Sequence, residues 1–120
     1  MVNQNRAMTQ PTHFAFVLVP EFSHLAFANA VEPLRIANLI SGEALYRWSF
    51  LSETGAPAEA SNGSLTVVHH GFDDIPACDL MFVLSGVGVK SHCSRALRAR
   101  GVALGALCSG AWVLAEAGFL

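Results

Sequence analysis

Cys108 stands out as a candidate for chemistry because it lies in the stretch GVALGALCSGAWVLAEAG, where a strand-like run gives way to a helix-like one. Residues 102–104 form an apolar run typical of a buried strand, and residues 111–117 are rich in good helix formers. A side chain on such a turn lies over unpaired backbone N–H groups at the positive end of the helix dipole, which stabilise a thiolate and lower the pKa of a thiol. The small residues Ala106 and Gly110 fit the tight turn of a nucleophile elbow. The pattern predicts a reactive Cys108, and the alternative is a buried structural cysteine.

Other candidate sites are weaker. The chain has three cysteines and no C-x-x-C pair, which fits neither a disulfide framework nor a zinc cage and is typical of a reducing compartment. The adjacent pairs His69-His70 and His92-Cys93 would point to opposite faces of a strand, so neither is expected to chelate an ion. The loop that starts at Gly86 lacks the third glycine and the following acid of a dinucleotide fingerprint. We therefore expect neither a metal nor a cofactor.

Composition limits the remaining possibilities. The chain has 120 residues, of which 52% are hydrophobic and 13% charged, and its formal net charge is -2. That length and hydrophobicity suit one domain, and the charge gives no general attraction to nucleic acid or to an anionic membrane. Residues 1–13 read as a flexible polar tail rather than a signal peptide, and no run approaches the roughly 18 apolar residues of a membrane span. We expect a soluble cytoplasmic protein.

The first half of the chain predicts a strand, a helix, a second strand and a hairpin. Residues 14–19 form a continuous apolar run, typical of a strand buried on both faces. Helical spacing begins at Leu25, and Pro33 predicts a kink or a restart. Residues 46–51 alternate like a strand, and the Asn62-Gly63 turn between two short β-prone runs predicts a hairpin or a surface excursion.

The second half predicts a strand over residues 79–84, a short helix over 91–100, and then the strand, cysteine and helix around Cys108. Apolar strands that alternate with helices indicate an α/β fold with a parallel sheet and right-handed crossovers. Ligands bind such folds at the carboxyl ends of the strands. In this chain Glu21, Gly86 and Cys108 are predicted to lie there.

Three segments, FVLVPEFSHLAFANAVEPLRIANLISG, LYRWSFLSETGAPAEASNG and GVALGALCSGAWVLAEAGFL, together resemble the ThiJ/PfpI domain, a class I glutamine amidotransferase-like fold. More narrowly, they resemble the version at the N-terminus of AraC-family transcriptional regulators, over residues 14–120. The resemblance implies a flavodoxin-like three-layer sandwich with a mostly parallel sheet, C-terminally truncated at Leu120 so that an apolar edge is exposed. It also implies a homodimer that senses a small metabolite, with DNA bound only through a C-terminal helix-turn-helix domain that this chain does not contain.

Three departures from the family pattern bear on activity. Ser109 follows the cysteine where enzymes of the superfamily often have a histidine, and Leu25 takes the aligned position of an acid on the first helix. Gly86-Val87 replaces a common Gly-Gly pair while keeping the backbone N–H of an oxyanion hole. We therefore predict a non-catalytic sensor, with a ligand site at Glu21, Gly86, Val87, Cys108 and Ser109. The alternatives are a cysteine-dependent amidase, hydrolase or glyoxalase-like enzyme in which Cys108 is catalytic, and a redox-sensing thiol.

Overall fold

A parallel sheet forms the centre of the computed structural model, which describes residues 10–85 and the backbone of residues 103–108. In this part of the chain the sheet has four strands in the order β2-β1-β5-β6, and every neighbouring pair is parallel. The strands are β1 (Thr12–Leu18), β2 (Tyr46–Leu51), β5 (Leu80–Ser85) and β6 (Ala103–Cys108). The predicted α/β fold with a parallel sheet is confirmed.

Strand β1 starts earlier than its apolar run suggests. The strand begins at Thr12, whose N–H donates to the carbonyl of Leu45 at 3.0 Å, and it includes His13, which is only 5% exposed. Sequence patterning missed these two positions because both residues are polar. The first residues of the strand are therefore held by specific hydrogen bonds rather than by hydrophobic burial.

Helix α1 (His24–Ser41) covers one face of the sheet. Ser23 caps its start by accepting a hydrogen bond from the Ala26 N–H at 3.2 Å, and Gly42, with φ of 73°, ends it in the left-handed conformation. The predicted restart at Pro33 is wrong, because α1 is a single helix that includes this residue. Pro33 is exposed, so the carbonyl one turn earlier can be hydrated in place of the missing backbone bond.

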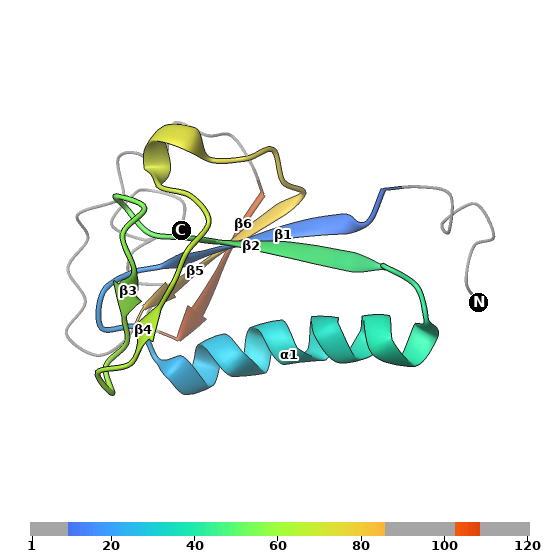
Figure 1. The fold of residues 1–120 in the computed structure, drawn as a ribbon, viewed down its shortest axis with the longest axis horizontal. Helices are drawn as coiled ribbons and strands as arrows, with labels where there is room; N and C mark the ends of the chain where they lie inside the picture. Colours follow the sequence, from blue (N-terminus) through green and yellow to red (C-terminus); the bar gives the residue numbers. More distant parts are fainter. Residues whose placement is uncertain (1–9, 86–102, 109–120) are drawn as a thin grey trace.

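A short antiparallel hairpin follows β2, as the Asn62-Gly63 pair predicts. Its strands are β3 (Ala58–Glu59) and β4 (Leu65–Thr66). Gly63 has φ of 88°, which a glycine adopts without steric cost. The chain then forms the short 3-10 helix η2 (Phe72–Asp74), which lies on the opposite side of the sheet from α1 (Figure 1).

Two hydrophobic cores pack against the two faces of the sheet. On the α1 face, Phe16 and Leu18 of β1 pack with Phe27 of the helix. On the other face, Val17 and its neighbours pack with Phe72 of η2. Burying each such side chain stabilises the fold by about 1.5–3 kcal/mol, so β1, apolar on both faces, is the centre of the molecule.

Strand β6 is longer than the predicted run, and Cys108 is its last residue. The predicted helices over residues 91–100 and 111–117 lie outside the described residues, as do Gly86, Val87 and Ser109. Within the described part of the chain, no helix has both the length and the hydropathy needed to cross a membrane.

Candidate functional site

The strand order creates a topological switch point at the carboxyl ends of β1 and β5. The chain leaves β1 for β2 on one side and later returns to β5 on the other side of β1. At such a switch point the connections diverge and leave space for a ligand. The Val19 N–H donates to the Leu84 carbonyl at 3.0 Å, so the two strands stay paired up to this edge. Glu21 follows β1, while Ser85 and Cys108 end β5 and β6.

Glu21 has an unusual backbone conformation. Among the described residues it is the one non-glycine residue with a positive φ, 72°. Its N–H donates to the carbonyl of Glu59 at 2.9 Å, and the next residue, Phe22, forms a bridge with Ala60. The first hairpin strand therefore holds the turn in a conformation that costs a residue with a side chain about 1–2 kcal/mol. Glu21 is an exposed residue just beyond the end of β1.

Ser85 is a candidate site residue that sequence reasoning missed. Its side chain is fully buried, and within the described structure its Oγ has no hydrogen-bond partner. Such a hydroxyl is unfavourable unless a bound molecule or an ordered water satisfies it. The signal in the sequence is a polar residue that ends an apolar run directly before Gly86.

The register places Ser85 opposite Cys108 on the neighbouring strand. Positions paired in this way lie about 4.8 Å apart on the same face of the sheet. Of the predicted site residues, the structure thus brings the positions of Glu21 and Cys108 to one edge of the sheet. The elbow turn itself lies beyond the described residues. Leu25, which the sequence resemblance aligns with an acid of the family, is 71% exposed on α1.

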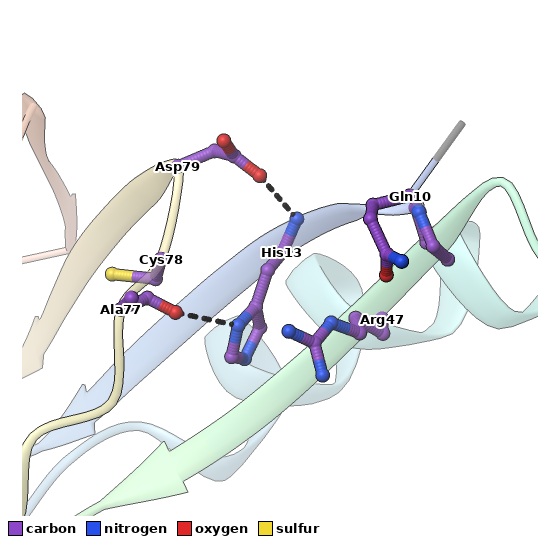
Figure 2. Close-up of a pocket in the computed structure, with 7 residues that line it drawn as sticks. Gln10, His13, Arg47, Ala77, Cys78 and Asp79 are labelled. Atoms are coloured by element: carbon purple, nitrogen blue, oxygen red, sulfur yellow. Dashed lines mark hydrogen bonds between the residues drawn. The ribbon is translucent and has the colours of Figure 1, made fainter. Parts of the chain in front are cut away.

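A cavity of about 340 Å³ lies at the opposite, amino-terminal ends of the strands (Figure 2). His13 forms its centre. Nδ1 of His13 donates to the Ala77 carbonyl at 3.0 Å, which leaves Nε2 to accept a hydrogen bond from the Ser49 hydroxyl at 2.7 Å. The His13 N–H donates to Oδ2 of Asp79 at 2.8 Å. These bonds join β1 to β2 and to the segment that leads into β5.

Two titratable side chains that line this cavity, His13 and Cys78, have pKa values shifted in favour of their neutral forms. Burial, together with the positive charge of Arg47, lowers the pKa of His13 below 6.5. Burial raises the pKa of the Cys78 thiol, and the neighbouring Asp79 carboxylate raises it further. A protonated thiol and a fully bonded imidazole are poor nucleophiles. The hydrogen bonds of His13 instead hold three segments together at the base of the sheet.

The adjacent histidines His69 and His70 have separate roles. Nδ1 of His69 accepts a hydrogen bond from the Phe50 N–H at 2.8 Å, and the His69 N–H donates to the Phe50 carbonyl at 2.8 Å. Nδ1 of His70 pairs with Oδ2 of Asp74 at 3.0 Å. In the part of the chain that the structure describes, no three His, Cys, Asp or Glu side chains come together as metal ligands do.

Comparison with known proteins identifies the kind of domain, although no family model matches the chain. The HTH-type transcriptional regulator GbdR of Pseudomonas aeruginosa is 41% identical in an alignment 124 positions long, which covers 98% of this chain and 33% of the regulator. The crystal structure of an AraC family transcriptional regulator from Pseudomonas putida superposes with a TM-score of 0.75 at 29% identity, over 90% of this chain and 71% of that one. A ThiJ/PfpI family protein from Pseudomonas syringae superposes with a TM-score of 0.72 at 17% identity, over 100% of this chain and 53% of that one, and this shows a shared fold.

The parallel sheet thus has the fold seen in a ThiJ/PfpI family protein. More particularly, the chain is similar over nearly its whole length to part of the HTH-type transcriptional regulator GbdR and to the structure of an AraC family transcriptional regulator. It spans about a third of the length of the curated relatives that it matches.

Proposed function

We propose that this chain is the ligand-sensing domain of an AraC-family transcriptional regulator in the cytoplasm. A small metabolite binds at the carboxyl ends of β1, β5 and β6, and DNA is bound through a separate helix-turn-helix domain. The ligand site comprises Glu21, Gly86, Val87, Cys108 and Ser109, to which the geometry of β5 adds Ser85.

The observation that carries this proposal is the coincidence of two unfavourable features at the edge where doubly wound folds bind ligands. Glu21 is strained, and the hydroxyl of Ser85 is buried without a partner. Features that lower stability persist where binding needs them. The match to transcriptional regulators over nearly the whole chain supports a sensor rather than an enzyme.

A sensor is favoured over a hydrolase because nucleophilic catalysis by a thiol needs a general base. Leu25 occupies the family's acid position, the first turn of α1 contains no acidic residue, and Ser109 replaces histidine after Cys108. Without such partners, Cys108 forms part of the pocket wall rather than an attacking group.

Isothermal titration calorimetry on the chain tests the proposal. The probes are amines, amino acids and quaternary ammonium metabolites. We expect one class to bind saturably, and we expect Glu21→Gln to weaken it at least tenfold. Glu43→Gln is the matched control, because Glu43 lies beyond the far end of α1 and should leave binding unchanged.

The same protein samples also distinguish the metabolite sensor from the two alternatives, an enzyme and a redox sensor. If no probe binds and a substrate is turned over in a way that Cys108→Ala abolishes, the chain is an enzyme and the sensor proposal is wrong. If dilute peroxide adds oxygen to Cys108 while no metabolite binds, the chain is a redox sensor. Mass spectrometry of the Cys108 peptide reads out this second case.

A further inference from the structure

The tip of the β3–β4 hairpin holds an exposed asparagine whose side chain is fixed against its own backbone. Oδ1 of Asn62 accepts two hydrogen bonds from Ser64, one from the N–H at 2.9 Å and one from the hydroxyl at 2.7 Å. The first of these bonds closes an Asx turn. Asn62 and Gly63 are both exposed to solvent. The side-chain amide of Asn62 is therefore accessible to water, and its carbonyl is polarised by two donors.

The residue after this asparagine has an unshielded backbone nitrogen. Gly63 has φ of 88°, and a Cβ at this position would meet no heavy atom of the described residues within 4 Å. Any other residue here would place a side chain beside the nitrogen, and glycine does not. The Gly63 N–H donates to the Ala60 carbonyl at 2.9 Å. The nitrogen thus becomes available when a single hydrogen bond of an exposed turn opens, and such local opening costs far less than unfolding.

We propose that Asn62 is a site of spontaneous deamidation. The Gly63 nitrogen attacks Cγ of Asn62, and the new N–Cγ bond closes a succinimide ring. The Cγ–Nδ2 bond breaks, and Nδ2 takes the proton of the Gly63 N–H and leaves as ammonia. Water then cleaves one of the two C–N bonds of the imide, which gives either aspartate or isoaspartate. Negative charge develops on Oδ1 during the attack, and both donors of Ser64 are directed at that atom.

Conversion to isoaspartate changes the turn that closes the hairpin. It lengthens the backbone at position 62 by one carbon atom and displaces the carbonyl that accepts from Ser64. Directly behind this turn, the Ala60 N–H donates to the Ser64 carbonyl at 2.9 Å. The preceding residue, Glu59, accepts the N–H of the strained Glu21 at 2.9 Å. Deamidation therefore weakens the support of the turn after β1, irreversibly and as a function of time.

Peptide mass spectrometry of the chain, sampled during incubation at mildly alkaline pH, tests the site. We expect the peptide that contains Asn62 to gain the mass difference between an amide and an acid, and to separate into an aspartate and an isoaspartate product. Asn38 is the internal control, because its side-chain amide is bonded at both ends to the backbone of Tyr46 and a leucine follows it. Its conversion should be at least tenfold slower. An intact Asn62, or equal rates at the two asparagines, overturns the proposal.

Two serine variants test the role of the hydrogen bonds. Ser64→Ala removes the hydroxyl that donates to Oδ1 and should slow the loss of the Asn62 amide at least threefold. Ser61→Ala makes the same chemical change on the other side of the asparagine and is the matched control. It should deamidate at the wild-type rate. Equal rates in the two variants would show that Ser64 does not promote the attack.

Hydrogen exchange followed by NMR tests the effect on the hairpin. The amides of Ala60 and Glu21 should exchange at least fivefold faster in the purified isoaspartate form than in the unmodified chain. The Val19 amide, which donates to the Leu84 carbonyl at 3.0 Å, is the control and should keep its rate. If the Ala60 and Glu21 amides also keep their rates, the proposed loosening is wrong. None of these measurements uses a metabolite, so the deamidation proposal and the sensor proposal can fail separately.

Discussion

At the scale of single residues, the carboxyl edge of the sheet combines two features that a protein selected for stability alone would lose. Glu21 adopts a conformation that favours glycine, and the Ser85 hydroxyl is buried without a partner in the described structure. They come from different strands but lie at the same end of the sheet. Both can be removed without disturbing the packing around them, so their effects on stability and on binding can be separated.

Replacing Ser85 by alanine should stabilise the ligand-free chain by about 1 kcal/mol, because it removes a desolvated hydroxyl that forms no bond. Urea denaturation measures the free energy of unfolding. The matched control is Ser52→Ala, which loses a donor to Ala56 at 2.6 Å and an acceptor for Gly55 at 3.0 Å. That variant should lose about 1–2 kcal/mol. Equal destabilisation of the two variants would show that Ser85 has a structural partner.

Replacing Glu21 by glycine should raise the free energy of unfolding by up to about 1 kcal/mol, since glycine adopts a positive φ without steric cost. The control is Glu59→Gly on β3, where glycine weakens a strand and should lower stability by about 0.5–1 kcal/mol. The comparison uses the same urea denaturation. An unstable Glu21→Gly variant would mean that the carboxylate has a structural role.

At the scale of elements, two loops approach each other closely at Gly71. A Cβ at this position would lie 2.8 Å from the carbonyl carbon of Thr54 and 2.9 Å from the nitrogen of Gly55. The loop after β2 and the start of η2 are therefore in backbone contact. This contact positions Phe72 in the core on the face opposite α1.

Gly71→Ala should therefore destabilise the chain by more than about 2 kcal/mol, because backbone atoms rather than a flexible side chain must move. Gly42→Ala is the control. Gly42 has φ of 73° and open space around it, so this substitution should cost only about 1 kcal/mol of conformational strain. Thermal unfolding followed by circular dichroism gives both values. If Gly71→Ala and Gly42→Ala lower stability by similar amounts, the two loops can move apart at Gly71 without a large energetic cost.

Most elements could be predicted because their signals are local. The apolar run of β5, the alternation of β2 and the Asn62-Gly63 turn each depend on a few adjacent residues. The continuity of α1 could not be predicted, because the cost of Pro33 depends on whether the preceding carbonyl can be hydrated. The start of β1 was missed because His13 is buried through partners that are 36 and 64 residues away.

The candidate site was predictable only in outline. Glu21 and Cys108 could be assigned to the carboxyl ends of strands from the positions of the apolar runs. The strand order that makes β1 and β5 neighbours is a property of the whole chain and leaves no local signal. The unpaired state of Ser85 depends on everything packed around it, so only the structure reveals it.

At the scale of the whole molecule, stability depends on a neutral His13 at the base of the sheet. Its pKa is lowered by burial and by Arg47, so the unfolded chain binds a proton more readily than the folded one. The contribution of neutral His13 to the free energy of unfolding is therefore fully present above about pH 6.5. It is lost as the pH decreases through the lower pKa of the folded state.

Urea denaturation between pH 5 and 8 should show this loss on the acid side. Arg47→Gln should reduce the loss, because removing the positive charge brings the pKa of His13 back toward 6.5. Arg35→Gln, a charge change on the surface of α1, is the control and should leave the slope near pH 6 unchanged. A steeper slope in the Arg47 variant would contradict the assignment to His13.

The pairing of His69 and His70 with Phe50 and Ser52 has a further consequence for β2, which is the outermost strand on its side of the sheet among the residues that the structure describes. The imidazole Nδ1 of His69 and three backbone bonds occupy the outward-facing groups at the end of this strand. A strand from a neighbouring molecule could not pair with β2 here, because these backbone groups of β2 already form hydrogen bonds. Fibre-like growth of the sheet is therefore blocked at this end of the strand by two residues of the same polypeptide.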